Sequence, residues 1–254
     1  IVEDINDKNK NIHGGFVAQD LKNAQFKNVK ALGSLILEPL FIFYRKDLEL
    51  NSLADFKGLK IGIGPENSGT RLLAETILNI YGVNDKNTYF VDKTHSIHFD
   101  MMNKSNLDVG FFLLPANNQF VFKLGTNPNL KIFPLKNSKA ISRKFDYLYP
   151  EVVQAGGFDL KNIIPKKDIE VVSLPVDLVA KKNLDPSVVV AIALILKEEF
   201  KEPNVISDAS TFPSMKYIKN LEVNKRAKEI IEMPFGSLPF LYKYLPFKFA
   251  AFID

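Results

Sequence analysis

Apolar positions in this chain switch repeatedly between short extended runs and helical spacing. The extended runs predict strands at residues 12–18, 29–37, 61–63, 88–91, 106–114 and 130–134. Helical spacing predicts helices over residues 68–81, 95–103, 117–124, 140–149, 186–200 and 223–232. Strands that alternate with helices are typical of parallel βαβ units, so the sequence predicts an α/β fold class.

Two longer extended segments interrupt this alternation. The strand at 29–37 continues into an aromatic segment that ends at Tyr44, and residues 169–180 form a second long segment, which we expect Pro175 to break. Both are extended patterns and neither has helical spacing.

An internal echo indicates two similar halves. Asn11-Ile-His-Gly-Gly-Phe-Val resembles Asn106-Leu-Asp-Val-Gly-Phe-Phe, and each is followed by a second apolar strand, at Asn28-Val-Lys-Ala-Leu and Asn129-Leu-Lys-Ile-Phe. The echo favours two α/β lobes that are built alike, with a cleft between them. Chance similarity between two ordinary βαβ pieces is the alternative.

The stretch from Lys60 to Ala74 carries the clearest chemical signal. A strand at 61–63 is followed by turn residues from Gly64 to Asn67, and Ser68 stands where a helix N-cap is favoured. A glycine turn that opens a helix leaves unpaired N–H groups at the positive end of the helix dipole. This arrangement predicts a pocket for a carboxylate or phosphate. An ordinary capped turn between strand and helix is the alternative.

The same stretch has the glycine spacing of a phosphate loop, at Gly64 and Gly69. That motif needs Lys followed by Ser or Thr after the second glycine, and here Thr70 and Arg71 follow instead. Carboxylate capture is therefore favoured over nucleotide hydrolysis.

Composition narrows the class of protein. The chain has 254 residues, 46% hydrophobic and 24% charged, which is typical of a globular domain. The formal charge is +4 with Lys and Arg spread evenly, so a nucleic-acid partner is not expected. There are no cysteines, which excludes disulfides and thiolate chemistry.

Catalytic and metal-binding patterns are weak. His95 and His98 share a helical face and could bind a metal, but no third ligand stands at a telling spacing, so a solvated pair is favoured. No Gly-x-Ser-x-Gly elbow is present. We therefore expect no catalytic residue, metal or cofactor. Aromatic residues at strand ends, such as Phe41, Phe111 and Phe112, are core residues or enclose a ligand.

With these motifs, the chain resembles the TAXI family, the solute receptors of TRAP transporters. The resemblance rests on Leu35-Ile-Leu-Glu-Pro-Leu-Phe-Ile-Phe-Tyr-Arg45, on Leu53-Ala-Asp-Phe-Lys-Gly-Leu-Lys-Ile-Gly-Ile-Gly64 with Asn67-Ser-Gly-Thr-Arg71, and on Leu107-Asp-Val-Gly-Phe-Phe112. It also rests on Pro165-Lys-Lys-Asp168 and on the ending Tyr244-Leu-Pro-Phe-Lys-Phe-Ala250 with Ile253-Asp254.

The resemblance implies a type II periplasmic-binding-protein fold, each lobe a mostly parallel sheet flanked by helices. Lobe I would comprise 1–44 and 172–254, and lobe II 45–171, with the first lobe incomplete at its N-terminus. It places the ligand carboxylate at Ser68, Gly69 and Thr70. Further ligand-binding candidates are Asn67, Arg71, Glu38, Phe41, Phe111 and Phe112.

The implied function is that of an extracytoplasmic receptor. It would capture a small carboxylate, such as an amino acid or dicarboxylate, and deliver it to the membrane subunits of a TRAP-type transporter. The start at Ile1 is typical of a processed chain from which a signal peptide has been removed, and the apolar, lysine-flanked tail suits a membrane anchor beyond it. The alternatives are a sensor or scaffold that keeps the fold, or an enzyme on the same scaffold.

Overall fold

In the computed structural model the chain folds into two compact units. Unit 1 comprises Ile1–Leu37 and Leu174–Asp254, and unit 2 comprises Glu38–Ser173. The described residues are 5, 10–18, 28–237 and 243–244. Nearly all of the apolar tail lies outside them. The lobe boundaries at 44/45 and 171/172 stay predictions.

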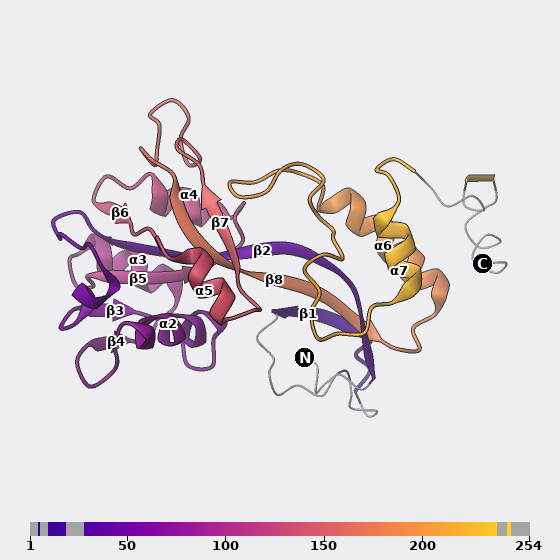
Figure 1. Cartoon of the computed structure of the whole chain (residues 1–254), viewed down its shortest axis with the longest axis horizontal. Coiled ribbons are helices and arrows are strands. Elements are labelled where there is room, and N and C mark those ends of the chain that lie inside the picture. Colours follow the sequence, from indigo (N-terminus) through magenta and orange to yellow (C-terminus); the bar gives the residue numbers. More distant parts are fainter. Residues whose placement is uncertain (1–4, 6–9, 19–27, 238–242, 245–254) are drawn as a thin grey trace. The chain divides into compact units, whose positions relative to one another are not determined.

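Unit 2 is built around a mixed sheet in the order β2-β5-β3-β4 (Figure 1). These strands are β2 (Val29–Arg45), β3 (Lys60–Gly62), β4 (Tyr89–Val91) and β5 (Val109–Leu113). Strand β3 is parallel to both β4 and β5, whereas β2 is antiparallel to β5. Beyond it, β6 (Leu130–Ile132) pairs with β2, and β7 (Tyr149–Val153) pairs with β8 (Ile169–Lys181).

Helices connect the strands of unit 2. They are α2 (Gly69–Ile80), α3 (His95–Asn103), α4 (Gln119–Gly125) and α5 (Ser138–Lys144), with a 3₁₀ turn at Leu53–Phe56. The hydroxyl of Ser52 caps this turn and Asp55 completes a capping box, so the turn begins where the sequence offers a cap. The residues of α2 that face the sheet, including Leu73 and Ile77, are buried.

The core of unit 2 is aromatic. Alternate residues of β2 and β5 point to opposite faces of the sheet. On one face the Phe56 ring meets Phe111 and Phe133, with centroid separations of 6.3 and 5.1 Å. On the other face Phe43 meets Phe112 at 6.0 Å. The rings are tilted or edge-on to each other, which is the arrangement that aromatic pairs prefer.

Unit 1 contains β1 (Gly14–Ala18), which runs antiparallel to β8, and the helices α6 (Pro186–Glu199) and α7 (Lys225–Glu232). Asp185 accepts a hydrogen bond from the Ser187 amide at 2.8 Å, and Pro186 occupies the first helical position. The predicted start of this helix is therefore confirmed. Its apolar face packs on α7 through a buried cluster that includes Val189 and Ile230.

The two units repeat one strand arrangement. In unit 2, β5 lies against β2 and β2 against β6; in unit 1, β1 lies against β8 and β8 against β2. The echoed sequences fall on equivalent strands, because residues 14–18 and 109–113 form β1 and β5 while residues 29 and 130 begin β2 and β6. This arrangement supports the predicted similarity between residues 11–17 and 106–112. The α/β fold class is confirmed.

Two local predictions were wrong. The helix expected over 140–149 ends at Lys144, and Tyr149 begins β7, because the backbone turns extended at Phe145. Pro175 does not break β8. It lies between the residues paired with β7 and those paired with β1, where neither strand needs its missing N–H. Within the described ranges, no helix has the length and apolar character needed to cross a membrane.

Candidate functional site

The connection from β3 to α2 is folded as a tight polar turn. Gly64 has a φ of +88°, which favours glycine. A Cβ there would also lie 2.9 Å from Ser68 Oγ and 3.0 Å from the Thr70 Cβ. Asn67 adopts a φ of +59°, a conformation that Asn tolerates, as its predicted turn role requires. The turn thus brings Ser68 and Thr70 against its own backbone.

Two backbone amides at the start of α2 lack an acceptor in the described part of the chain, and one of them belongs to the buried residue Thr70. Ser68 Oγ accepts a hydrogen bond from the Arg71 amide at 3.2 Å, and Ser68 O accepts one from Leu72. The amides of Gly69 and Thr70 have no acceptor among the described residues. The first turn carries no acidic side chain of its own.

The turn follows the carboxyl end of β3, which lies between β5 and β4 in the sheet. Strands β3 and β5 are neighbours in the sheet. From β3 the chain passes through α2 to β4, which lies on the side of β3 away from β5. From β5 it passes through α4 to β6, which pairs with β2 on the opposite side. The carboxyl ends of β3 and β5 therefore flank a point where the connections diverge. In open α/β sheets, ligands bind outside the carboxyl ends of the strands at such a switch point.

A histidine that the sequence analysis did not assign to this site supports it. His95 Nε2 lies 3.2 Å from Thr70 Oγ1, and its ring lies 5.5 Å from the Phe112 ring. Burial lowers the pKa of His95. The signal was present in the sequence, because His95 follows β4, and the carboxyl ends of adjacent parallel strands meet at one edge of a sheet.

The predicted solvated pair of His95 and His98 was wrong. His98 is fully buried, its Nε2 lies 3.1 Å from the Val91 carbonyl, and its Nδ1 has no partner. Gly62 makes room for it, since a Cβ on Gly62 would lie 2.7 Å from the imidazole. Burial is the main cause that lowers the pKa of His98 to about 4. No group of three or more potential metal ligands occurs in the part of the chain that the structure describes.

Arg71 is already engaged within unit 2. Its Nε lies 2.9 Å from Glu75, and its second nitrogen lies 3.3 Å from an Asp92 carboxylate oxygen. The guanidinium therefore belongs to an ion-pair network beside the turn. A ligand contact by Arg71 stays a prediction.

The remaining candidates lie in β2 and β5. Glu38 is partly buried, and desolvation raises its pKa to about 6. Phe41, Phe111 and Phe112 have no exposed surface. Of these three, Phe112 contacts the His95 ring from within the core. Direct ligand contacts by these four residues stay predictions.

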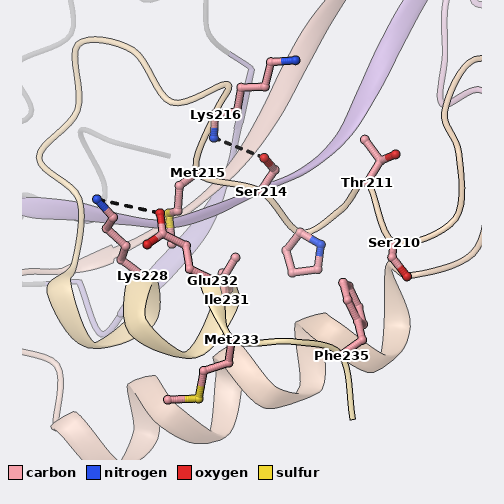
Figure 2. Close-up of a pocket in the computed structure, with 11 residues that line it drawn as sticks. Ser210, Thr211, Ser214, Met215, Lys216, Lys228, Ile231, Glu232, Met233 and Phe235 are labelled. Atoms are coloured by element: carbon pink, nitrogen blue, oxygen red, sulfur yellow. Dashed lines mark hydrogen bonds and ion pairs between the residues drawn. The ribbon is translucent and has the colours of Figure 1, made fainter. Parts of the chain in front are cut away.

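A separate pocket lies in unit 1 (Figure 2). It has a volume of about 550 Å³ between the segment 210–216 and the C-terminal end of α7. Its charged residues include Lys228 and Glu232, which form an ion pair at 3.8 Å, and the Lys216 amide donates to Ser214 Oγ at 3.2 Å. None of the predicted ligand residues lines this pocket.

Comparison with protein families gives a direct assignment. Residues 13–224 match the model of the NMT1-like family. The chain belongs to the NMT1-like family. The matched region contains the turn at the start of α2, His95 and both long strands.

Several solved structures resemble this NMT1-like protein at low identity. The periplasmic aliphatic sulphonate-binding protein SsuA from Escherichia coli is 11% identical, with a TM-score of 0.47 over 74% of this chain and 51% of that one. A sulfonate-binding SsuA from Methylobacillus flagellatus KT is 14% identical, with a TM-score of 0.45 over 74% and 48%. An ancestral arginine-binding protein bound to arginine is 14% identical, with a TM-score of 0.43 over 73% and 63%. The chain spans about half the length of the two sulfonate-binding proteins.

Proposed function

We propose that this NMT1-like protein is an extracytoplasmic solute-binding protein that holds the anionic group of a small ligand at the start of α2. The observation that carries the proposal is the pair of unpartnered amides at Gly69 and Thr70, at the positive end of a helix. The Thr70 hydroxyl, positioned by His95, adds a side-chain group beside them. Binding of this kind involves no covalent step.

The ligand class follows from the donors. Amides and a hydroxyl suit a carboxylate, such as that of an amino acid or dicarboxylate, and also the sulfonate group named for two of the similar structures. A phosphate-loop lysine is missing, which favours a singly charged group over a nucleotide. We propose the carboxylate as the first choice.

Delivery to a transporter completes the proposal. The predicted partners are the membrane subunits of a TRAP-type transporter, whereas one of the similar structures is named for an ABC transporter. Both roles place the protein outside the cytoplasm. Closure of the two predicted lobes over the ligand stays a prediction.

Substitutions at Gly69 test the site while leaving the helix intact. Gly69 is the first helical residue, where proline is tolerated, and Ser68 has φ −83° and ψ 149°, which suits a residue before proline. Gly69→Pro removes one amide donor. Gly69→Ala keeps it, and its Cβ would make only an ordinary contact of 3.4 Å with Leu113. The pair therefore isolates the N–H group.

The measurement is a thermal-shift screen of small carboxylates and sulfonates, followed by calorimetry on the ligands that raise the melting temperature. A hydrogen bond from a backbone N–H to a charged group contributes about 1.5–3 kcal/mol. Gly69→Pro should therefore weaken binding by roughly tenfold or more. Gly69→Ala should bind like the parent protein. Equal affinity of the parent and Gly69→Pro for a genuine ligand would show that the site lies elsewhere.

A further inference from the structure

The connection between β7 and β8, residues 154–168, projects beyond the ends of both strands (Figure 1). We call it the β7–β8 loop. Leu160 at its tip is 85% exposed, the highest value for a large apolar side chain among the described residues. Ile163, three residues later, is 52% exposed. The loop therefore presents two aliphatic side chains to its surroundings.

This loop is built as a defined structure on the core of unit 2. Phe158 is only 7% exposed and packs edge-on against Phe41 and Phe122, at centroid distances of 6.2 and 6.1 Å. The amide of Phe158 donates to the Ile164 carbonyl at 2.7 Å, and the Ile164 amide donates to the Asp159 carbonyl at 2.9 Å. The exposed tip is thus held by a buried anchor and backbone bonds at its base.

The backbone at Ile163 indicates that its side chain has a role outside the fold. Its φ is +51°, in the left-handed region that a β-branched residue adopts only at an energetic cost. Asparagine or glycine would fit this conformation better. Burial does not offset the strain, because half of the side chain is exposed. Strain kept at an exposed position suggests function.

The loop carries three lysines and two aspartates. Lys161 and Lys167 are exposed and have no ion-pair partner in the described part of the chain. Lys166 Nζ donates to the Asn162 carbonyl at 2.7 Å. The carboxylates of the loop face its own backbone: Asp159 accepts from the Asn162 amide, and Asp168 accepts from the Ala155 amide.

The combination favours a lipid surface over a protein partner. Protein interfaces are depleted in lysine, and their strongest contacts come from Trp, Tyr and Arg, none of which occurs between 154 and 168. Aliphatic side chains flanked by lysines are typical of segments that enter the headgroup region of anionic membranes. We propose that the β7–β8 loop docks on an anionic phospholipid bilayer by inserting Leu160 and Ile163, with Lys161, Lys166 and Lys167 at the lipid phosphates.

The test is co-sedimentation of the whole chain with vesicles. Vesicles of phosphatidylglycerol mixed with phosphatidylcholine should pellet the protein, and vesicles of phosphatidylcholine alone should pellet far less. Leu160→Ser with Ile163→Asn should reduce the affinity for vesicles by about a hundredfold, since each aliphatic side chain contributes about tenfold when it leaves water. Ile163→Asn fits the left-handed backbone, so the double variant should fold.

Ile97→Asn is the matched control, because Ile97 is a 44% exposed apolar residue on α3 in the same unit. It should bind vesicles like the parent protein. Raised salt should weaken binding by screening the lysines. No pelleting of the parent protein, or pelleting that the double variant retains, would overturn the proposal. Equal pelleting with neutral vesicles would contradict the assignment of the lysines.

Discussion

Replacement of Gly64 by alanine should distort the turn at the start of α2. The same replacement at a matched glycine, Gly58, should not distort it. Gly64 and Gly58 lie in the same unit, with φ values of +88° and +80°. A left-handed conformation costs a non-glycine residue about 1–2 kcal/mol, so both substitutions should carry this cost. The two positions differ in what the new Cβ would meet.

At Gly64 the Cβ would lie 2.9 Å from Ser68 Oγ and 3.0 Å from Thr70 Cβ, whereas at Gly58 nothing lies within 4 Å. Forcing such a contact typically adds about 1–3 kcal/mol. We therefore expect Gly58→Ala to lower the free energy of unfolding by about 1–2 kcal/mol and Gly64→Ala by about 2–5 kcal/mol.

Urea denaturation of both variants measures this difference through the transition midpoints. The Gly64→Ala variant should also lose ligand affinity, because the contact displaces Ser68 and Thr70, and Gly58→Ala should keep it. Equal destabilisation by the two variants, or unchanged ligand affinity in Gly64→Ala, would refute the reasoning that this turn is shaped by close approach.

Three further outcomes are expected. Glu38→Gln should raise the free energy of unfolding by about 2 kcal/mol at pH 7, because burial raises the pKa of the Glu38 carboxyl from 4.5 to about 6. The free energy of unfolding of the parent protein should fall as the pH rises from 4.5 to 6. The advantage of the Gln variant should vanish below pH 4.5. His98→Phe should reduce the loss of stability between pH 6.5 and 4, because the lowered pKa of this buried histidine means that only the unfolded chain gains its proton there; an unchanged urea-denaturation profile would contradict this. Lys197→Met should destabilise unit 1 by about 1–3 kcal/mol, because the buried ammonium donates a hydrogen bond to the Ile230 carbonyl, at 3.0 Å, near the end of α7. Lys201→Met removes only an exposed ion pair and should have little effect in the same urea-denaturation assay.

Much of the fold was predictable because the sequence carries local signals for it. Ser68 and Asp185 are good helix caps, and the predicted helices begin at them. The echo between residues 11–17 and 106–112 predicted two equivalent strands, β1 and β5. Such signals involve neighbours along the chain, which the sequence displays directly.

The errors arose where distant residues decide the structure. The continuity of β8 through Pro175 depends on where β7 and β1 end, and nothing near Pro175 in sequence shows this. His98 is buried because Gly62, on another strand, leaves space for its ring. The contact between Thr70 and His95 likewise joins residues on two helices that only the sheet brings together.

The candidate site was predicted in part. The sequence showed the turn and its cap, but which amides lack an acceptor is decided by the folded chain. Aromatic residues gave the weakest guidance. Phe41, Phe111 and Phe112 lie wholly within the core, and their sequence pattern is the same for a core residue and for a ligand wall.

The most direct test of the account follows the amide protons of Gly69 and Thr70 by nuclear magnetic resonance during a ligand titration. With a small carboxylate that raises the melting temperature, these two amides should show the largest shifts, towards the values of hydrogen-bonded amides, and saturate with the calorimetric affinity. A ligand that binds while both amide signals stay unchanged would contradict the claim that the start of α2 holds its anionic group.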